Sequence, residues 1–299
     1  MRKQTAFLKY SFLGIVFLIN TYILALLLNI ILSIGGHSSF GLAFLLSVIS
    51  MVFIAWLLIT PLGSNYLAWS ARLRDPRNDE FTLIKPNLSH LTDKGLFITN
   101  IDVKISDDTF SNAYAIGKNI VAVTTGLIEE VKRGSTSYDQ LKGILAHELG
   151  HIKHGDSQIL AMVIAFNAIG KIIVDFFANL SSFISRLFIG ASNSTDDNNV
   201  NTGCCIAGIF LSIFSLLANL SSFILYGIIL PIGLHAIGRE EEYEADQYSA
   251  SLGYGNYLAD YLESVHCKES KPDSLASKLF STHPPIEERV KQLRSFTKS

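Results

Sequence analysis

The chain has 299 residues, of which 49% are hydrophobic and 17% are charged. Soluble domains carry roughly 25% charged residues, so this composition excludes an ordinary soluble globule. The net charge of −2 provides no basic surface, which excludes nucleic acid as a partner. No charged residue occurs from Tyr10 to Ala71 or from Asn198 to Gly238. Because a bilayer-spanning helix needs about 20 apolar residues, both runs predict contact with the lipid bilayer as membrane spans.

The first uncharged run is long enough for two transmembrane helices. Gly35 and Gly36 interrupt it, so we expect spans at about residues 8–33 and 40–61, with Pro61 ending the second. The apolar stretch exceeds the core of a signal peptide, and we expect it to be a retained anchor. Lys and Arg flank this hairpin on both outer sides and are absent from its turn. The positive-inside rule therefore predicts that the amino terminus and the chain after residue 64 are cytoplasmic.

Residues 64–156 have the composition of a soluble α+β segment. Three pieces rich in Val, Ile, Thr and Tyr predict short strands, namely GLFITNIDVKI, NAYAIGKN and IVAVTTGLI. Helical patterning begins at Tyr138, with Ser137 or Thr136 as its cap, and continues past His151. These features predict a small sheet beside one helix.

The second hydrophobic region contains one clear span and one ambiguous segment. Residues 203–234 are uncharged, and the polar stretch SNSTDDNNVNTG separates them from residues 159–190. The segment 159–190 is apolar but contains Lys171 and Asp175, which are four residues apart and can pair on one helical face. Taken alone, this segment fits either a span or a surface helix.

The sequence His-Glu-Leu-Gly-His at residues 147–151 predicts a metal site. On a helix, His147 and His151 lie one turn apart on the same face, so both imidazoles can bind one zinc ion. Glu148 lies on the adjoining side, where it can take a proton from the attacking water. The alternative is a solvated helix face that happens to carry two histidines.

A catalytic zinc site needs a third protein ligand, and the acidic segment at residues 239–246 provides candidates. Glu242 is followed one turn later by Asp246, which can accept the far N–H of a ligating histidine and fix its tautomer. We therefore select Glu242 as the ligand and Asp246 as its supporting residue. Glu240, Glu241 and Glu244 are expected on a solvated helix face. Helical phase directs His154 away from the other two histidines, so it is not expected to bind the metal.

Four sequence blocks resemble the HtpX-type membrane metalloproteases, relatives of the CAAX prenyl proteases. The blocks are NAYAIGKN…VAVTTGLI, AHELGHIKHGD, REEEYEAD and STHPPIEERVKQL, and the resemblance covers their order and nearly the whole chain. It implies a zincin-like (gluzincin) protease domain in which Glu242 is the third zinc ligand. It further implies that the segment Asn112–Gly117, which includes Ala113, Tyr114 and Ala115, is an edge strand holding the substrate backbone.

The resemblance also places Arg239 and His283 near the cleft, with His283 stabilising the oxyanion. The sequence His-Pro-Pro at this point also fits the start of a helix, with proline in its first turn. The family is implied to act in quality control, cleaving misfolded or damaged membrane proteins of the bacterial inner membrane.

The metal ligands must meet on one side of the membrane, which constrains the topology. The chain between His151 and Glu242 must cross the membrane an even number of times, so residues 159–190 should cross together with 203–234. We therefore predict an α-helical membrane protein with four spans and with the site and both termini in the cytoplasm. Its parts are hairpins at 1–63 and 157–235 and protease parts at 64–156 and 236–299.

These inferences predict an integral-membrane endopeptidase with one Zn²⁺ per chain, acting on protein substrates that include membrane proteins. One alternative is a CAAX-type prenyl protease, but those relatives have more spans than this chain provides. The other is a non-catalytic scaffold with structural zinc, or a transporter, and the intramembrane Lys171 and Asp175 are its only support. Structural zinc sites are closed by four protein ligands, and this chain offers three. The sequence indicates no oligomeric state.

Overall fold

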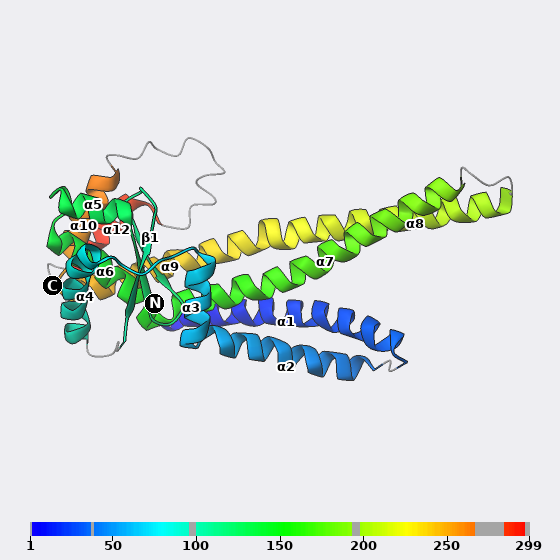
Figure 1. The fold of residues 1–299 in the computed structure, drawn as a ribbon, viewed down its shortest axis with the longest axis horizontal. Helices are drawn as coiled ribbons and strands as arrows, with labels where there is room; N and C mark the ends of the chain where they lie inside the picture. Colours follow the sequence, from blue (N-terminus) through cyan, green and yellow to red (C-terminus); the bar gives the residue numbers. More distant parts are fainter. Residues whose placement is uncertain (1, 37–38, 96–99, 193–197, 267–283, 297–299) are drawn as a thin grey trace. The chain divides into compact units, whose positions relative to one another are not determined.

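The computed structural model describes residues 2–36, 39–95, 100–192, 198–266 and 284–296 (Figure 1). The chain forms two compact units. The first, called the sheet unit, comprises residues 1–11, 53–162 and 234–299, and the second, called the helical unit, comprises residues 12–52 and 163–233.

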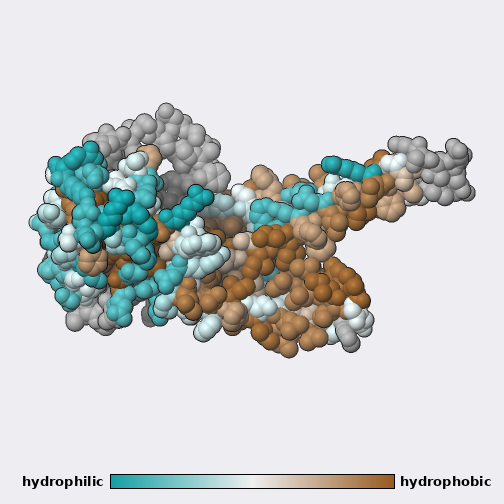
Figure 2. Space-filling view, viewed as in Figure 1, coloured by the Kyte–Doolittle hydropathy of each residue, from teal (hydrophilic) through white to brown (hydrophobic). Residues whose placement is uncertain are grey.

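The helical unit is built from long apolar helices. It contains α8 (Asn198–Ser222) and the π-helical segment η1 (Phe223–Ile229), most of α1 (Arg2–Ile34), α2 (Phe40–Leu58) and α7 (Asp156–Ser192), and only the start of α9 (Leu230–Ser251), whose remainder belongs to the sheet unit. Among the described residues, four helical stretches are long and apolar enough to cross a membrane: Ala6–Ile34, Phe40–Leu58, Asp156–Ala191 and Thr202–Ser251. Hydrophobic side chains dominate the visible surface of these helices (Figure 2). The prediction of a helical membrane protein with four spans is confirmed.

Serine side chains join α7 to α8. Ser181 donates to the carbonyl of Leu211, Ser185 to that of Gly208, and Ser215 to that of Ala178, at 2.7–2.9 Å. In lipid, helices associate through small residues and inter-helix hydrogen bonds, because burial of apolar surface gives no net gain there. These bonds therefore hold the two helices as a pair.

The sheet unit contains a three-stranded sheet in the order β1-β3-β2. The strands are β1 (Asp102–Ser106), β2 (Ala113–Ile116) and β3 (Ile120–Thr124); β1 is parallel to β3 and β2 is antiparallel to it. Every residue of β3 is buried, as expected for a central strand in this β-branched sequence. The strand β2 is left at one edge.

Six further helices lie in the described part of this unit: α3 (Pro61–Ser70), α4 (Asn78–Gly95), α5 (Thr125–Lys132), α6 (Tyr138–His154), α10 (Gly255–His266) and α12 (Ile286–Phe296). One hydrophobic core joins the sheet to α4, α6, α10 and α12 through side chains including Leu88, Ile105, Leu145, Leu258 and Leu293. The helix α6 is therefore buried against the sheet.

Several sequence expectations about element boundaries need correction. Pro61 is the first residue of α3, capped by Thr60, because proline suits the first helical turn as well as a helix end. The strand expected over IVAVTTGLI ends at Thr124, whose hydroxyl caps α5. The polar stretch expected to separate the last two spans already becomes helical at Asn198. The helices α3, α4 and α5 were not predicted.

A tight turn between β2 and β3 depends on Gly117. Its φ is +57°, its carbonyl accepts from the Ser157 hydroxyl at 2.6 Å, and a Cβ atom there would lie 2.4 Å from Ser64 Oγ. We expect Gly117→Ala to destabilise the sheet unit by about 2–4 kcal/mol, through backbone strain plus overpacking. Gly134→Ala is the control, since its φ is +77° but nothing lies within 4 Å of an added Cβ. It should cost only about 1–2 kcal/mol. If both variants lowered the thermal unfolding midpoint equally, the predicted clash between the added Cβ atom and Ser64 would be contradicted.

Candidate metal centre

The helix α6 is defined at both ends by its own sequence. Ser137 and Gln140 form a capping box at its start, and Gly155 ends it in the left-handed conformation with φ 73°. The predicted helix is confirmed, and of the two predicted caps Ser137 rather than Thr136 is the one observed. His147 and His151 lie one turn apart near the end of this helix, and their ring nitrogens Nε2 are 3.2 Å apart.

A close approach of α9 brings the second part of the site to α6. A Cβ atom at Gly150 would lie 2.9 Å from Ala245 Cα, so only glycine fits this contact without a shift. Ser249 Oγ, one turn beyond Ala245 in α9, donates to the carbonyl of Gly143, about two turns before Gly150 in α6, at 3.0 Å. Glu242 and Asp246 are thereby placed beside the two histidines.

The donor atoms of His147, His151 and Glu242 form a cluster in which all lie within 4.8 Å of one another. The two carboxylate oxygens of Glu242 lie 3.4 Å and 3.5 Å from the Nε2 atoms of His147 and His151. Tetrahedral zinc with bonds of about 2.0–2.1 Å requires ligand atoms about 3.3 Å apart. The distances and the donor chemistry of these residues both fit a zinc ion.

Each histidine is held from behind by a buried carboxylate. Asp246 lies 2.9 Å from His147 Nδ1, and Asp156 lies 2.8 Å from His151 Nδ1. A carboxylate at Nδ1 fixes the tautomer that leaves Nε2 available to a metal. Sequence reasoning expected the contact of Asp246 but missed Asp156. Asp156 follows the turn at Gly155 and begins α7, so helical phase along α6 could not place it.

Asp156 also contacts Lys9, whose side chain comes from the amino-terminal helix and is only 4% exposed. Lys9 Nζ lies 3.0 Å from Glu241 Oε1 as well. The prediction that Glu241 and Glu244 lie on a solvated face is wrong, since both side chains are about 15% exposed. The helix α9 is covered on more than the one face that carries Glu242.

Arg289 of α12 completes the buried charge network, and sequence reasoning missed it. Its guanidinium binds both oxygens of Asp246, at 2.7 Å and 2.8 Å, and donates to Glu242 at 2.8 Å. It is only 6% exposed. The signal available in the sequence was its place in the block STHPPIEERVKQL, but no spacing rule separates it from the other charges there.

Electrostatic conditions differ among the three groups on α6. Burial opposes protonation of His147, but its hydrogen bonds to Asp246 and Glu242 outweigh burial and raise its pKa. Burial also opposes protonation of His151, but Asp156, Glu242 and Glu148 outweigh burial and hold its pKa well above the ordinary value. Burial is also the main reason why the pKa of Glu148 is raised. A carboxyl group with a raised pKa is suited to take up and release a proton.

Glu148 lies on α6, which packs against the edge strand β2. The backbone of Ala115 in β2 favours the charged form of its carboxyl group and so opposes the effect of burial on its pKa. Asn112 pairs through its backbone with Thr124, and Ala113 and Tyr114 continue β2 opposite Val123 and Ala122. The segment expected to hold substrate is therefore an edge strand that reaches Glu148.

The structure does not place the remaining residues considered in the sequence analysis in the donor cluster. Arg239 is exposed, and its ion pair is with Glu288 of α12 at 3.7 Å. His283 lies outside the described residues. His154 is not part of the donor cluster; its Nδ1 lies 3.9 Å from Glu244.

The fold and the donor cluster define a membrane-anchored metallopeptidase, and sequence comparison agrees. Residues 96–297 match peptidase family M48, so the chain belongs to that family and is a membrane metalloprotease. It is 33% identical over 245 residues to a protease HtpX homolog of Thermoanaerobacter pseudethanolicus, covering 74% of this chain and 75% of the relative. A protease HtpX homolog of Dictyoglomus turgidum is 30% identical over 276 residues, covering 81% of each. The resemblance to HtpX-type proteases is confirmed.

One solved structure, the crystal structure of S. mikatae Ste24p, is similar at 22% identity and a TM-score of 0.48. The match covers 84% of this chain and 58% of the Ste24p chain.

We predict that Arg289→Met destabilises the sheet unit by about 3–5 kcal/mol, because Asp246 would stay buried without its cationic partner. Arg294→Met is a matched control on the same helix. Arg294 is 39% exposed and pairs with the half-exposed Asp260, so its loss should cost at most about 1 kcal/mol. Urea unfolding in detergent would measure both changes. Equal small losses would show that the Arg289 network contributes little.

Proposed function

We propose that this protein is an integral-membrane zinc endopeptidase that hydrolyses peptide bonds of misfolded or damaged membrane proteins. The observation that carries the proposal is the juxtaposition of three donor side chains with a buried glutamate beside an edge strand. His147, His151 and Glu242 supply the donors, and Glu148 reaches the strand at Ala115. This set of groups meets the needs of peptide hydrolysis.

His147, His151 and Glu242 would hold the zinc ion, one per chain. Three imidazole and carboxylate ligands leave the fourth position open, as catalytic zinc sites require. Zinc bound there would polarise the scissile carbonyl and lower the pKa of the attacking water. Asp246 and Asp156 keep the two imidazoles in the ligating tautomer, and Arg289 holds Asp246 and Glu242 in place.

Glu148 acts as the general base and then as the general acid. It takes one proton from the water as the oxygen adds to the scissile carbonyl carbon. It then delivers that proton to the amide nitrogen as the C–N bond breaks, which releases a carboxylic acid and an amine. Its burial favours this exchange, because a raised pKa brings the carboxyl group closer to the operating pH.

The substrate would lie extended along β2, pairing with the backbone of residues 112–115. Edge strands present unpaired backbone groups, and peptides bind them by adding a strand. Such binding depends mainly on backbone atoms, so selectivity among side chains would be loose. Loose selectivity suits the removal of damaged proteins, and the similarity to HtpX homologs supports this role.

We predict that wild-type protein and Glu148→Gln bind zinc equally and that only the wild type cleaves casein. The amide keeps the size of Glu148 but cannot accept the proton, so the rate should fall by at least about 100-fold. Both proteins are purified in detergent with a chelator to suppress self-cleavage, and zinc is then restored. Bound zinc is measured by elemental analysis and cleavage by gel electrophoresis.

Two outcomes would contradict this assignment. Casein cleavage by Glu148→Gln at the wild-type rate would remove Glu148 from the reaction. Zinc binding without cleavage of casein or membrane-protein substrates by either protein would make the site structural.

We also propose that the protein lies in the bacterial inner membrane with the metal site and both termini in the cytoplasm. The Lys and Arg residues flanking the first hairpin support this orientation. A fluorescent protein fused after Ser299 should then fluoresce, and alkaline phosphatase fused after Gly36 should be active. The reverse pattern would overturn the orientation without affecting the proposed chemistry.

A further inference from the structure

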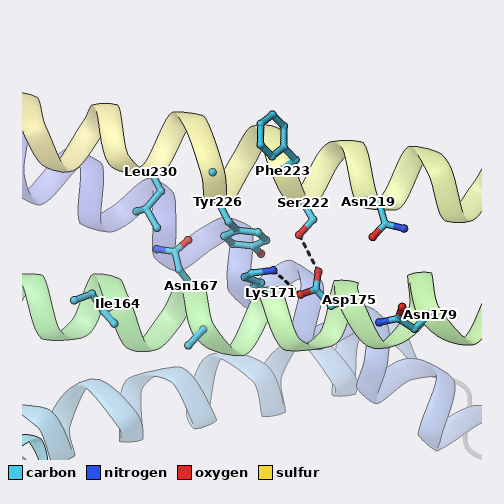
Figure 3. A pocket seen from close by; sticks show the side chains of 12 residues that line it. Ile164, Asn167, Lys171, Asp175, Asn179, Asn219, Ser222, Phe223, Tyr226 and Leu230 are labelled. Carbon is cyan, nitrogen blue, oxygen red and sulfur yellow. Dashed lines mark hydrogen bonds and ion pairs between the residues drawn. The ribbon is translucent and has the colours of Figure 1, made fainter. Parts of the chain in front are cut away.

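The helical unit contains a cavity of about 540 Å³ between α7 and the segment formed by α8, η1 and the start of α9, and its mainly apolar surface carries a row of polar side chains (Figure 3). One wall follows α7 at intervals of four residues, with Asn167, Lys171, Asp175 and Asn179 along a single face. The opposite wall includes Asn219, Ser222 and Tyr226. Neither the metal centre nor the proposed peptide strand uses any of these residues.

This cavity lies within a candidate membrane span. Lys171 is 15 residues from the start of the span Asp156–Ala191, and Asp175 is 16 residues from its end. Any stretch of about 20 residues within this span therefore includes at least one of the two. Charged residues at such depth are costly and mark functional sites by default.

Lys171 and Asp175 form an ion pair with each other, yet both side chains remain partly exposed. Lys171 Nζ lies 2.5 Å from Asp175 Oδ2, and Ser222 Oγ donates to Asp175 Oδ1 at 2.9 Å. The Lys171 and Asp175 side chains are nevertheless 52% and 37% exposed. A pair that served only to hold two helices together would be buried between them, whereas this pair lines an open cavity.

The end of the cavity near Tyr226 has a fixed shape. The Tyr226 hydroxyl donates to Asn20 Oδ1 at 3.2 Å, and both side chains are buried. A Cβ atom at Gly170 would lie 1.8 Å from Asn20 Oδ1, so α7 carries glycine where these two groups approach it. Tyr226 belongs to the π-helical segment η1, and short π-helical segments occur frequently at functional sites.

We propose that this cavity binds a polar side chain in a transmembrane segment of the substrate. The proposal rests on the proposed function and deepens it by naming the feature that selects a membrane protein. The lining supplies amide, hydroxyl, ammonium and carboxylate groups at its middle, with Ile164, Phe223 and Leu230 as apolar contacts. This lining fits an apolar helix that carries one uncompensated polar residue, such as a subunit that lacks its partner.

The test uses two single-span substrates that are identical except for Asn or Leu at the centre of the span. Full-length enzyme and substrate are reconstituted together into vesicles of phosphatidylethanolamine and phosphatidylglycerol. Wild-type enzyme should cleave the Asn substrate about tenfold faster than the Leu substrate. This ratio is the one expected if a single inter-helix hydrogen bond of the asparagine stabilises the complex. The variant Lys171→Met/Asp175→Leu should cleave both substrates at one rate.

Arg186→Met is the matched control, because Arg186 is a charged residue of the same helix that does not line the cavity. This control should keep the preference for the Asn substrate. All rates are compared at equal zinc content and relative to casein cleavage by the same preparation. If the double variant does not fold, Asn179→Leu and Ser222→Ala replace it, and each should reduce the preference.

A cross-linking experiment locates the occupant directly. In the Glu148→Gln background, a photoreactive amino acid at position 179 should cross-link the Asn substrate. The same group at Ile172, which is 68% exposed and does not line the cavity, should not cross-link it.

The outcomes separate this proposal from the proposed function. Equal cleavage of both membrane substrates by a wild type that cleaves casein would overturn the cavity proposal alone. Failure of the wild type to cleave casein would overturn the protease assignment itself. Cross-linking from position 179 only to a second copy of the enzyme would assign the cavity to self-association and overturn substrate binding there.

Discussion

The metal centre depends on the close approach of α6 and α9 at Gly150 and Ala245. These helices belong to chain segments separated by two apolar helices, and this contact helps to place Glu242 beside His147 and His151. The absence of a side chain at Gly150 allows the approach, since a Cβ atom there would lie 2.9 Å from the α9 backbone. The glycine within the His-Glu-Leu-Gly-His sequence therefore has a steric function that is separate from metal binding.

Buried opposite charges then hold the two helices in register. Burying a charge is costly unless it is paired, so Asp246 and Asp156 require the cations that contact them. Arg289 arrives from the carboxyl-terminal helix and Lys9 from the amino-terminal helix. The first and last described helices thus support the two imidazoles of α6 through Asp156 and Asp246.

The helical unit uses polar groups in two different ways. Serine hydroxyls between α7 and α8 are bonded to backbone carbonyls and hold the pair together. The stripe containing Lys171 and Asp175 instead lines a cavity and stays partly exposed. This contrast separates polar groups that stabilise the membrane helices from polar groups that can interact with another transmembrane segment.

The sequence by itself determined the features that local periodicity encodes. Long uncharged runs predicted the spans. The i, i+4 spacing predicted His147 and His151 as two metal ligands on one helix face, and the same spacing selected Glu242 as the third ligand with Asp246 as its supporting residue. Tertiary structure alone decided that Asp156, Arg289 and Lys9 support the site and that Glu241 is buried. These contacts join residues from separate helices or across a chain reversal, and the physical cause is burial. The packing of all the helices decides which charged side chains are buried, and the spacing of residues along the chain does not predict it.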